Sequence, residues 1–127
     1  MFKVLVVDDV KYMRQVLKSI LSQAGFEIVG EAENGLDAFE KYKELKPDLV
    51  TLDISMPEKN GIEVLKDIME YDKTARVIMC AASSQKNMLP DAMKNGARDF
   101  ISKPFNPTDI VDILTRNSFN HCTLQTA

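Results

Sequence analysis

The chain has 127 residues, of which 45% are hydrophobic and 28% are charged, and its formal net charge is −3. This length and composition are typical of one folded globular domain and exclude a disordered chain. The acidic balance disfavours a nucleic-acid-binding protein, because that function requires a basic face. The apolar run near the start, Val4 to Val7, is too short for a signal peptide or a membrane span, so we expect a cytoplasmic protein without membrane insertion.

Short apolar runs alternate with helix-like segments five times along the chain. The runs predict β-strands at residues 3–8, 27–32, 48–53, 75–81 and 99–102. Such alternation is typical of parallel sheets, because a helix carries the chain back between successive strands. The sequence therefore predicts an α/β fold, a doubly wound five-stranded parallel sheet with helices on both faces.

Helical spacing and start signals mark four of the helices. Apolar residues repeat at helical spacing from Met13 to Ala24, and Gly25 follows as a stop signal. The other three helices begin at residues that favour a helix start: Asn34 for the second, Asn60-Gly61 for the third and Asn106-Pro107 for the last.

The fourth helix is irregular. A start near Ser84 would place Pro90 inside the helix, where a lost backbone hydrogen bond and a ring clash cost about 3 kcal/mol or more. The helix therefore either starts late, near Leu89, or is kinked. Gly96 ends it.

Residues 118–127 show no periodicity. We therefore divide the chain into a domain at 1–117 and a segment at 118–127, which we expect to be a disordered tail or the start of a linker.

Three of the predicted strands end in charged residues. Asp8 and Asp9 follow the first strand, Asp53 ends the third, and Lys103 follows the fifth. Because the carboxyl ends of parallel strands meet at one edge of the sheet, we expect these side chains to share a crevice. Two like charges ~4 Å apart repel by roughly 4 kcal/mol at an effective dielectric of ~20, so the carboxylates favour a divalent cation such as Mg²⁺.

This arrangement of charges also suits phosphoryl transfer. A carboxylate beside a metal ion and a lysine can attack a phosphorus atom whose oxygens both cations hold. We therefore interpret Asp53 as the phosphoacceptor and Lys103 as the charge partner of the phosphoryl group. The sequence contains neither the Gly-x-x-x-x-Gly-Lys loop nor the Gly-x-Gly-x-x-Gly turn of other phosphate-binding proteins.

Several short motifs resemble the receiver domains of bacterial two-component response regulators, close to the single-domain CheY-like chemotaxis type. The resemblance covers residues 2 to about 117, and the stretch from Val10 to Arg14 also looks like the chemotaxis branch. The matching motifs are Asp8-Asp9, Asp53 followed by Met56-Pro57 and Asn60-Gly61, Gly96-Ala97, and Lys103-Pro104-Phe105.

The resemblance implies a mechanism and a set of ligands. The aspartate that matches Asp53 receives a phosphoryl group from a phosphohistidine on a sensor histidine kinase. The residues that match Asp9, Asp53 and the backbone carbonyl of Ser55 hold Mg²⁺, and Asp8 acts through water. The family also implies a flavodoxin-like strand order of 2-1-3-4-5 and a cis peptide between Lys103 and Pro104.

One position departs from the family pattern. The switch residue at the end of the fourth strand, usually Ser or Thr, falls on Ala81, which has no hydroxyl to donate to the phosphoryl group. The aromatic switch position on the fifth strand falls on Phe100. Either the switch is weak or Ser83 or Ser84 compensates after a small loop shift, and an engineered substitution at Ala81 is a third explanation.

Three functional hypotheses follow from these observations. The first is a monomeric phosphorylation-controlled signalling protein, not an enzyme beyond transfer to and from itself, with chemotaxis output. Its downstream target would bind the fourth helix, fifth strand and fifth helix. The second is a degenerate receiver, a phosphorylation-independent scaffold, which Ala81 and Pro90 favour. The third is a small metal-dependent phosphohydrolase, although the chain has no cap to enclose a substrate.

Overall fold

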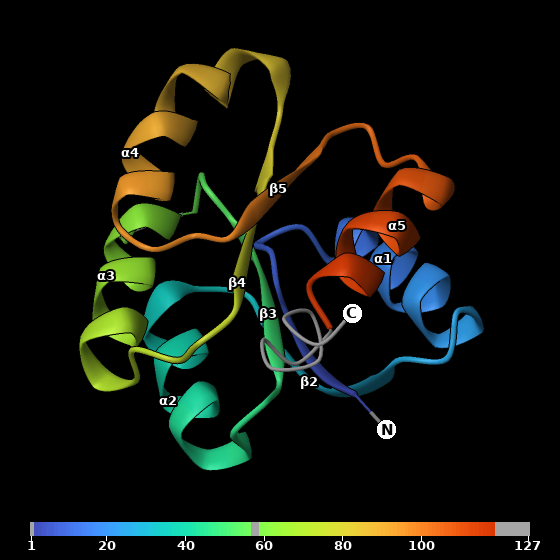
Figure 1. Cartoon of the computed structure of the whole chain (residues 1–127), viewed down its shortest axis with the longest axis horizontal. Helices are drawn as coiled ribbons and strands as arrows, with labels where there is room; N and C mark the ends of the chain where they lie inside the picture. Colours follow the sequence, from blue (N-terminus) through green and yellow to red (C-terminus); the bar gives the residue numbers. More distant parts are fainter. Residues whose placement is uncertain (1, 57–58, 119–127) are drawn as a thin grey trace, which may run out of the picture.

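Five parallel strands form one sheet between two layers of helices (Figure 1) in the computed structural model, which describes residues 2–56 and 59–118. The strand order is β2-β1-β3-β4-β5. This order confirms both the predicted doubly wound sheet and the order that the resemblance implies. The strands are β1 (Lys3–Val7), β2 (Glu27–Ala32), β3 (Leu49–Asp53), β4 (Val77–Ala81) and β5 (Asp99–Ser102).

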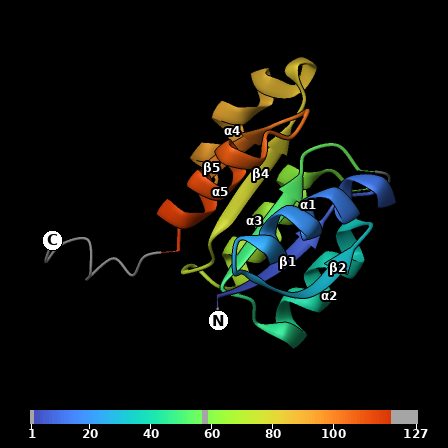
Figure 2. The same cartoon turned by 90° about the vertical axis from the view of Figure 1, so that its right-hand side faces the viewer.

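The helices cover both faces of the sheet (Figure 2). Helices α1 and α5 pack on one face, and α2, α3 and α4 pack on the other. A 3₁₀ helix, η1 (Ser83–Met88), leads into α4. The α-helices are α1 (Lys11–Gln23), α2 (Gly35–Leu45), α3 (Gly61–Tyr71), α4 (Leu89–Lys94) and α5 (Pro107–Arg116).

Two apolar cores lie on opposite sides of the central strands. In β1, Val4 and Val6 face the core under α1 and α5, whereas Leu5 and Val7 face the core under α2, α3 and α4. All four side chains are at most 1% exposed. Burial on both faces is what a near-continuous apolar strand predicts for a parallel sheet. The charged residues that follow such a strand are therefore held on a rigid base.

Asparagine caps begin three of the helices, as the sequence predicts. The side chain of Asn34 accepts from the backbone N–H of Asp37 at 2.8 Å, and Asn60 forms a capping box with Glu63. The side chain of Asn106 accepts from two backbone N–H groups in the first turn of α5. These bonds satisfy donors that a helix N-terminus leaves free, so they fix where each loop above the sheet ends.

The irregular fourth helix starts late. Residues 83–88 form the 3₁₀ helix, and α4 begins at Leu89 with Pro90 in its first turn. In the first turn of a helix a backbone N–H has no hydrogen-bond partner within the helix. Proline at this position therefore costs no helical hydrogen bond, and the helix is not kinked. Gly96 ends α4 with a φ of +109°, a conformation that favours glycine. Of the two alternatives, the late start is correct.

The expected tail falls almost entirely on residues 119–127, which lie outside the described part of the chain. The division at residue 117 stays a prediction. Among residues 2–56 and 59–118, none of the helices has both the length and the apolar character needed to cross a membrane.

Gly61 lies against the backbone at the end of β3. A Cβ atom built on Gly61 would stand 2.1 Å from the carbonyl oxygen of Asp53 and 2.8 Å from the Cα of Ile54. The N–H of Gly61 donates to the carbonyl of Ile54 at 2.6 Å. Since the obstacle is backbone, a side chain at this position forces the loop after Asp53 to move.

We predict that Gly61→Ala lowers the free energy of unfolding by about 1–3 kcal/mol, the usual range for overpacking. Urea unfolding followed by circular dichroism measures it. Gly30→Ala is the matched control, because its Cβ would meet the flexible end of the Leu45 side chain. An equal loss in both variants would contradict the role of the backbone contact.

Candidate functional site

Three carboxylates meet at the carboxyl end of the sheet. Asp8 and Asp9 directly follow β1, and Asp53 ends β3, the neighbouring strand. Each offers an oxygen, and these oxygens lie within 4.8 Å of one another. Asp8 and Asp53 are each 3% exposed, whereas Asp9 is exposed at the rim. We call these three residues the acidic cluster.

Lys103 joins the two buried members of the acidic cluster. Its ammonium Nζ lies 3.0 Å from Oδ2 of Asp8 and 3.1 Å from Oδ1 of Asp53. The peptide between Lys103 and Pro104 is cis, and the N–H of Lys103 donates to the carbonyl of Ala81 at the end of β4. The structure therefore brings together all four charged residues that the sequence places at strand ends.

The charges of this site do not balance. One ammonium faces three carboxylates, which leaves an excess of two negative charges when all are ionised. The pKa of Asp53 is raised from 3.8 to about 6, chiefly by burial and next by the charge of Asp8, against the opposing effect of Lys103. Burial opposes the charge of Lys103, but its bond to Asp8 and the charge of Asp53 outweigh that effect and raise its pKa.

This donor set fits a divalent cation. The ligand atoms are carboxylate oxygens, which Mg²⁺ prefers, and one member of the cluster is open to solvent so that the ion can keep water ligands. Two added positive charges would also neutralise the excess negative charge. Ser55 is exposed two residues beyond Asp53, and its carbonyl as a ligand stays a prediction.

The backbone around Asp8 is held from several sides. Oδ1 of its carboxylate accepts from the N–H of Val10 at 2.9 Å, and its carbonyl accepts from Nη1 of Arg14 at 2.7 Å. In the sequence, Arg14 is associated only with the motif that resembles the chemotaxis branch. A basic residue one helical turn into α1 was the available signal, but its partners are the carbonyl of Asp8, just after β1, and the carboxylate of Glu31 on β2, which spacing does not predict.

The two switch positions lie on the strands next to Lys103. Ala81 is buried at the end of β4, and its register partner on β5 is Ser102. Phe100 is 36% exposed on β5. Ser83 and Ser84, the residues considered as substitutes for the missing hydroxyl, are both exposed on η1.

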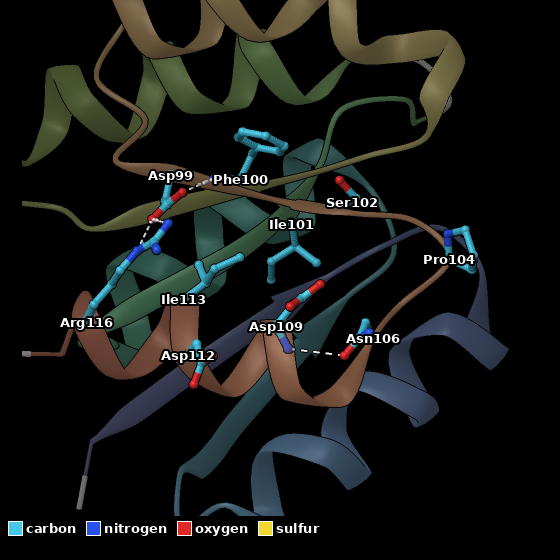
Figure 3. Close-up of a pocket in the computed structure, with 10 residues that line it drawn as sticks. All are labelled: Asp99, Phe100, Ile101, Ser102, Pro104, Asn106, Asp109, Asp112, Ile113 and Arg116. Atoms are coloured by element: carbon cyan, nitrogen blue, oxygen red, sulfur yellow. Dashed lines mark hydrogen bonds and ion pairs between the residues drawn. The ribbon is translucent and has the colours of Figure 1, made fainter.

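A groove of about 310 Å³ runs between β5 and α5 (Figure 3). Ile113 supplies apolar surface and Asp109 and Asp112 supply carboxylates, whereas the ring of Phe100 points to the side of β5 away from α5 (Figure 3). Arg116 contributes a guanidinium, but it pairs with Asp99 through Nε and Nη2. Since Ser102 and Pro104 also line the groove, it touches both neighbours of Lys103 in the chain.

The family model of the response regulator receiver domain matches residues 4–115. The chemotaxis protein CheY of Thermotoga maritima is 53% identical over 116 residues, which cover 91% of this chain and 97% of that protein. The CheY protein of Bacillus subtilis is 51% identical over 114 residues and covers 90% and 95% of the two chains.

A solved structure shares the fold closely. The CheY chain in a complex with CheX, BeF₃ and Mg²⁺ from Borrelia burgdorferi superposes with a TM-score of 0.89 and 38% identity. That match covers 94% of this chain and 90% of the other. The fold and the acidic cluster define a receiver domain, and the chain belongs to the response regulator receiver family. It is a phosphorylation-dependent signalling domain of the two-component type.

The raised pKa of Asp53 makes a pH dependence testable. The ordinary pKa of the group is 3.8, and in the folded protein it is about 6. Between these two pH values the folded chain therefore binds more protons at Asp53 than the unfolded chain does. The free energy of unfolding therefore falls as pH rises through this window.

We predict that Asp53→Asn raises the melting temperature in metal-free buffer near pH 7.5 by about 3–6 °C, the shift of about 1 kcal/mol in a domain of this size. Near pH 5 the variant should differ little from the original, because Asp53 is then mostly protonated. Thermal melts at both pH values measure the difference. Asp112→Asn, on the exposed surface of α5, is the control, and a stabilisation of Asp53→Asn that is equal at both pH values would contradict the prediction.

Proposed function

We propose that Asp53 accepts a phosphoryl group from a phosphohistidine of a sensor kinase, with Mg²⁺ held by Asp8, Asp9, Asp53 and the carbonyl of Ser55. The observation that carries this proposal is the contact of one buried ammonium, Lys103, with two buried carboxylates beside a third. The motifs and the family support the same roles. The bound ion would be a second cation, besides Lys103, next to the oxygens of the phosphoryl group.

The chain's own residues define the transfer step. Lys103 holds Oδ1 of Asp53, so we take Oδ2 as the attacking atom. Oδ2 forms the new bond to phosphorus while the phosphorus–nitrogen bond breaks, and the imidazole of the donor leaves with the electron pair. Lys103 then faces a phosphoryl oxygen, where an ammonium stabilises the charge that stays on the product. Hydrolysis of the aspartyl phosphate returns the site to its start.

The output surface in this proposal consists of α4, β5 and α5, which we call the output face. Lys103 connects the acidic cluster to the output face, because it bonds to the cluster and directly follows β5. The groove between β5 and α5 offers a recess for a segment of the target protein (Figure 3). The relatives named chemotaxis protein CheY support a target in chemotaxis signalling.

Ala81 sets how strongly phosphorylation reaches the output face. A ligand shifts a two-state element only through contacts that differ between the two states, and an alanine makes no hydrogen bond to a phosphoryl group. Phosphorylation therefore acts on η1 and α4 through Lys103 and the loop backbone. The scaffold hypothesis has Ala81 in its favour, but the intact acidic cluster and Lys103 favour the phosphorylated receiver.

We predict that incubation with Mg²⁺ and acetyl phosphate adds the mass of one phosphoryl group to the chain. Asp53→Asn should abolish the adduct because the attacking oxygen is gone, and Asp9→Asn should require at least tenfold more Mg²⁺ for the same yield. Intact-mass spectrometry measures both. Asp112→Asn is the control. An adduct that persists in Asp53→Asn would overturn the assignment, and many turnovers of an added phosphate ester would revive the phosphohydrolase.

We predict that Ala81→Ser strengthens the response of the output face to phosphorylation, since it restores a hydroxyl at the end of β4. The measurement is the change in amide chemical shifts over residues 83–102 when BeF₃⁻ and Mg²⁺ are added. The shifts should be larger in Ala81→Ser than in the original chain, and Ala82→Ser serves as the control. Equal shifts in all three proteins would show that a hydroxyl at residue 81 does not couple the phosphorylation site to the output face.

A further inference from the structure

Arg14 links the acidic cluster to a partly buried ionic network that involves Glu31 on β2. Its side chain is 9% exposed, and it uses two edges of the guanidinium at once. Nε donates to Oε1 of Glu31 at 2.7 Å, and Nη1 donates to the backbone carbonyl of Asp8 at 2.7 Å. A planar guanidinium presents both donors in a fixed geometry, which a lysine ammonium does not.

The carbonyl that Arg14 holds belongs to the peptide unit between Asp8 and Asp9. A peptide unit is planar, so fixing its oxygen fixes the direction in which the backbone enters Asp9. The N–H of Asp8 donates to the carbonyl of Ala32, and the N–H of Val10 donates to the Asp8 carboxylate. Arg14 therefore completes a set of bonds that orients the turn carrying the exposed carboxylate of Asp9.

Glu31 is itself held in place. Lys18 from α1 also bonds its carboxylate, and Lys41 from α2 bonds its backbone carbonyl. The bonds from Lys18 and Arg14 lower the pKa of Glu31, so it stays ionised at neutral pH. The anchor of Arg14 is thus a residue of β2 whose carboxylate is held by Lys18 of α1 and whose backbone is held by Lys41 of α2.

We propose that Arg14 is a positioning residue for the divalent cation, acting through the peptide between Asp8 and Asp9 and not through contact with the ion. This inference rests on the proposed Mg²⁺ site. Groups that orient the ligands of a metal ion change its affinity by about 10–100-fold when they are removed.

The sign of the effect separates positioning from simple electrostatics. Arg14 is a positive charge next to a site for a positive ion, so its removal would strengthen Mg²⁺ binding if charge alone mattered. Loss of positioning would weaken it. A replacement that keeps the aliphatic stem but not the guanidinium, Arg14→Met, therefore gives opposite results for the two explanations.

Isothermal titration of Mg²⁺ into the original chain and Arg14→Met tests the inference. We expect about tenfold weaker binding in Arg14→Met, and weaker binding also in Arg14→Lys, which keeps the charge and loses the two-edged contact. Lys43→Gln is the charge-matched control, because Lys43 pairs with Glu40 on α2 and bonds to neither Asp8 nor Glu31 among the described residues. It should bind Mg²⁺ as the original does.

A second measurement distinguishes positioning from a general loss of structure. The rate of phosphorylation by acetyl phosphate is followed against Mg²⁺ concentration. Arg14→Met should need about tenfold more Mg²⁺ for half the maximal rate and should reach an unchanged maximum.

If the original chain binds no Mg²⁺, the proposed function fails. If it binds Mg²⁺ and Arg14→Met binds it equally or more tightly, only the inference on Arg14 fails. If Arg14→Met does not fold, Arg14→Lys decides by the same criterion.

Discussion

The contact of the Lys103 ammonium with the carboxylates of Asp8 and Asp53 is the interaction on which the rest of the site depends. It joins the ends of three strands, with Lys103 lying 50 residues from Asp53 and 95 from Asp8 in the chain, and it is possible only when β1, β3 and β5 run parallel in one sheet. One buried ammonium cannot neutralise three carboxylates, so the fold keeps an excess negative charge where burial disfavours it. That excess is what makes this set of oxygen ligands suit a divalent cation.

The apolar residues of the central strands hold these like charges close together. β1 and β3 are buried on both faces, so the residues that follow them have little freedom to move apart. Gly61 brings the start of α3 against the backbone of Asp53, and the cis peptide before Pro104 turns the chain away directly after Lys103. Burial, and next the charge of Asp8, raise the pKa of Asp53 in this arrangement. A looser sheet edge would relieve the repulsion by letting the carboxylates separate, and it would lose the ion site.

The sequence predicts the fold and the charged residues of the site because both depend on local patterns. Apolar runs end in Asp8, Asp53 and Lys103, and parallel strands bring such ends to one edge. The late start of α4 stayed open, because the cost of Pro90 inside a helix excludes a regular helix from Ser84 but does not choose between a kink and a later start. Arg14 was beyond prediction, since its partner Glu31 lies on a strand whose register no local pattern fixes.

Ala81 shows how the acceptor function and the switch function separate within one fold. In the proposed function, the acceptor needs only the acidic cluster and Lys103, and all four residues stand at strand ends. The switch needs, in addition, a contact that differs between two positions of η1 and α4, and the buried methyl group of Ala81 cannot make a polar one. Lys103 still touches both systems, because its side chain faces Asp53 while its N–H donates to the carbonyl of Ala81. Under the proposed function, phosphorylation of Asp53 would therefore reach β4 and β5 through the backbone of Lys103, and the size of the effect would depend on how far Lys103 moves.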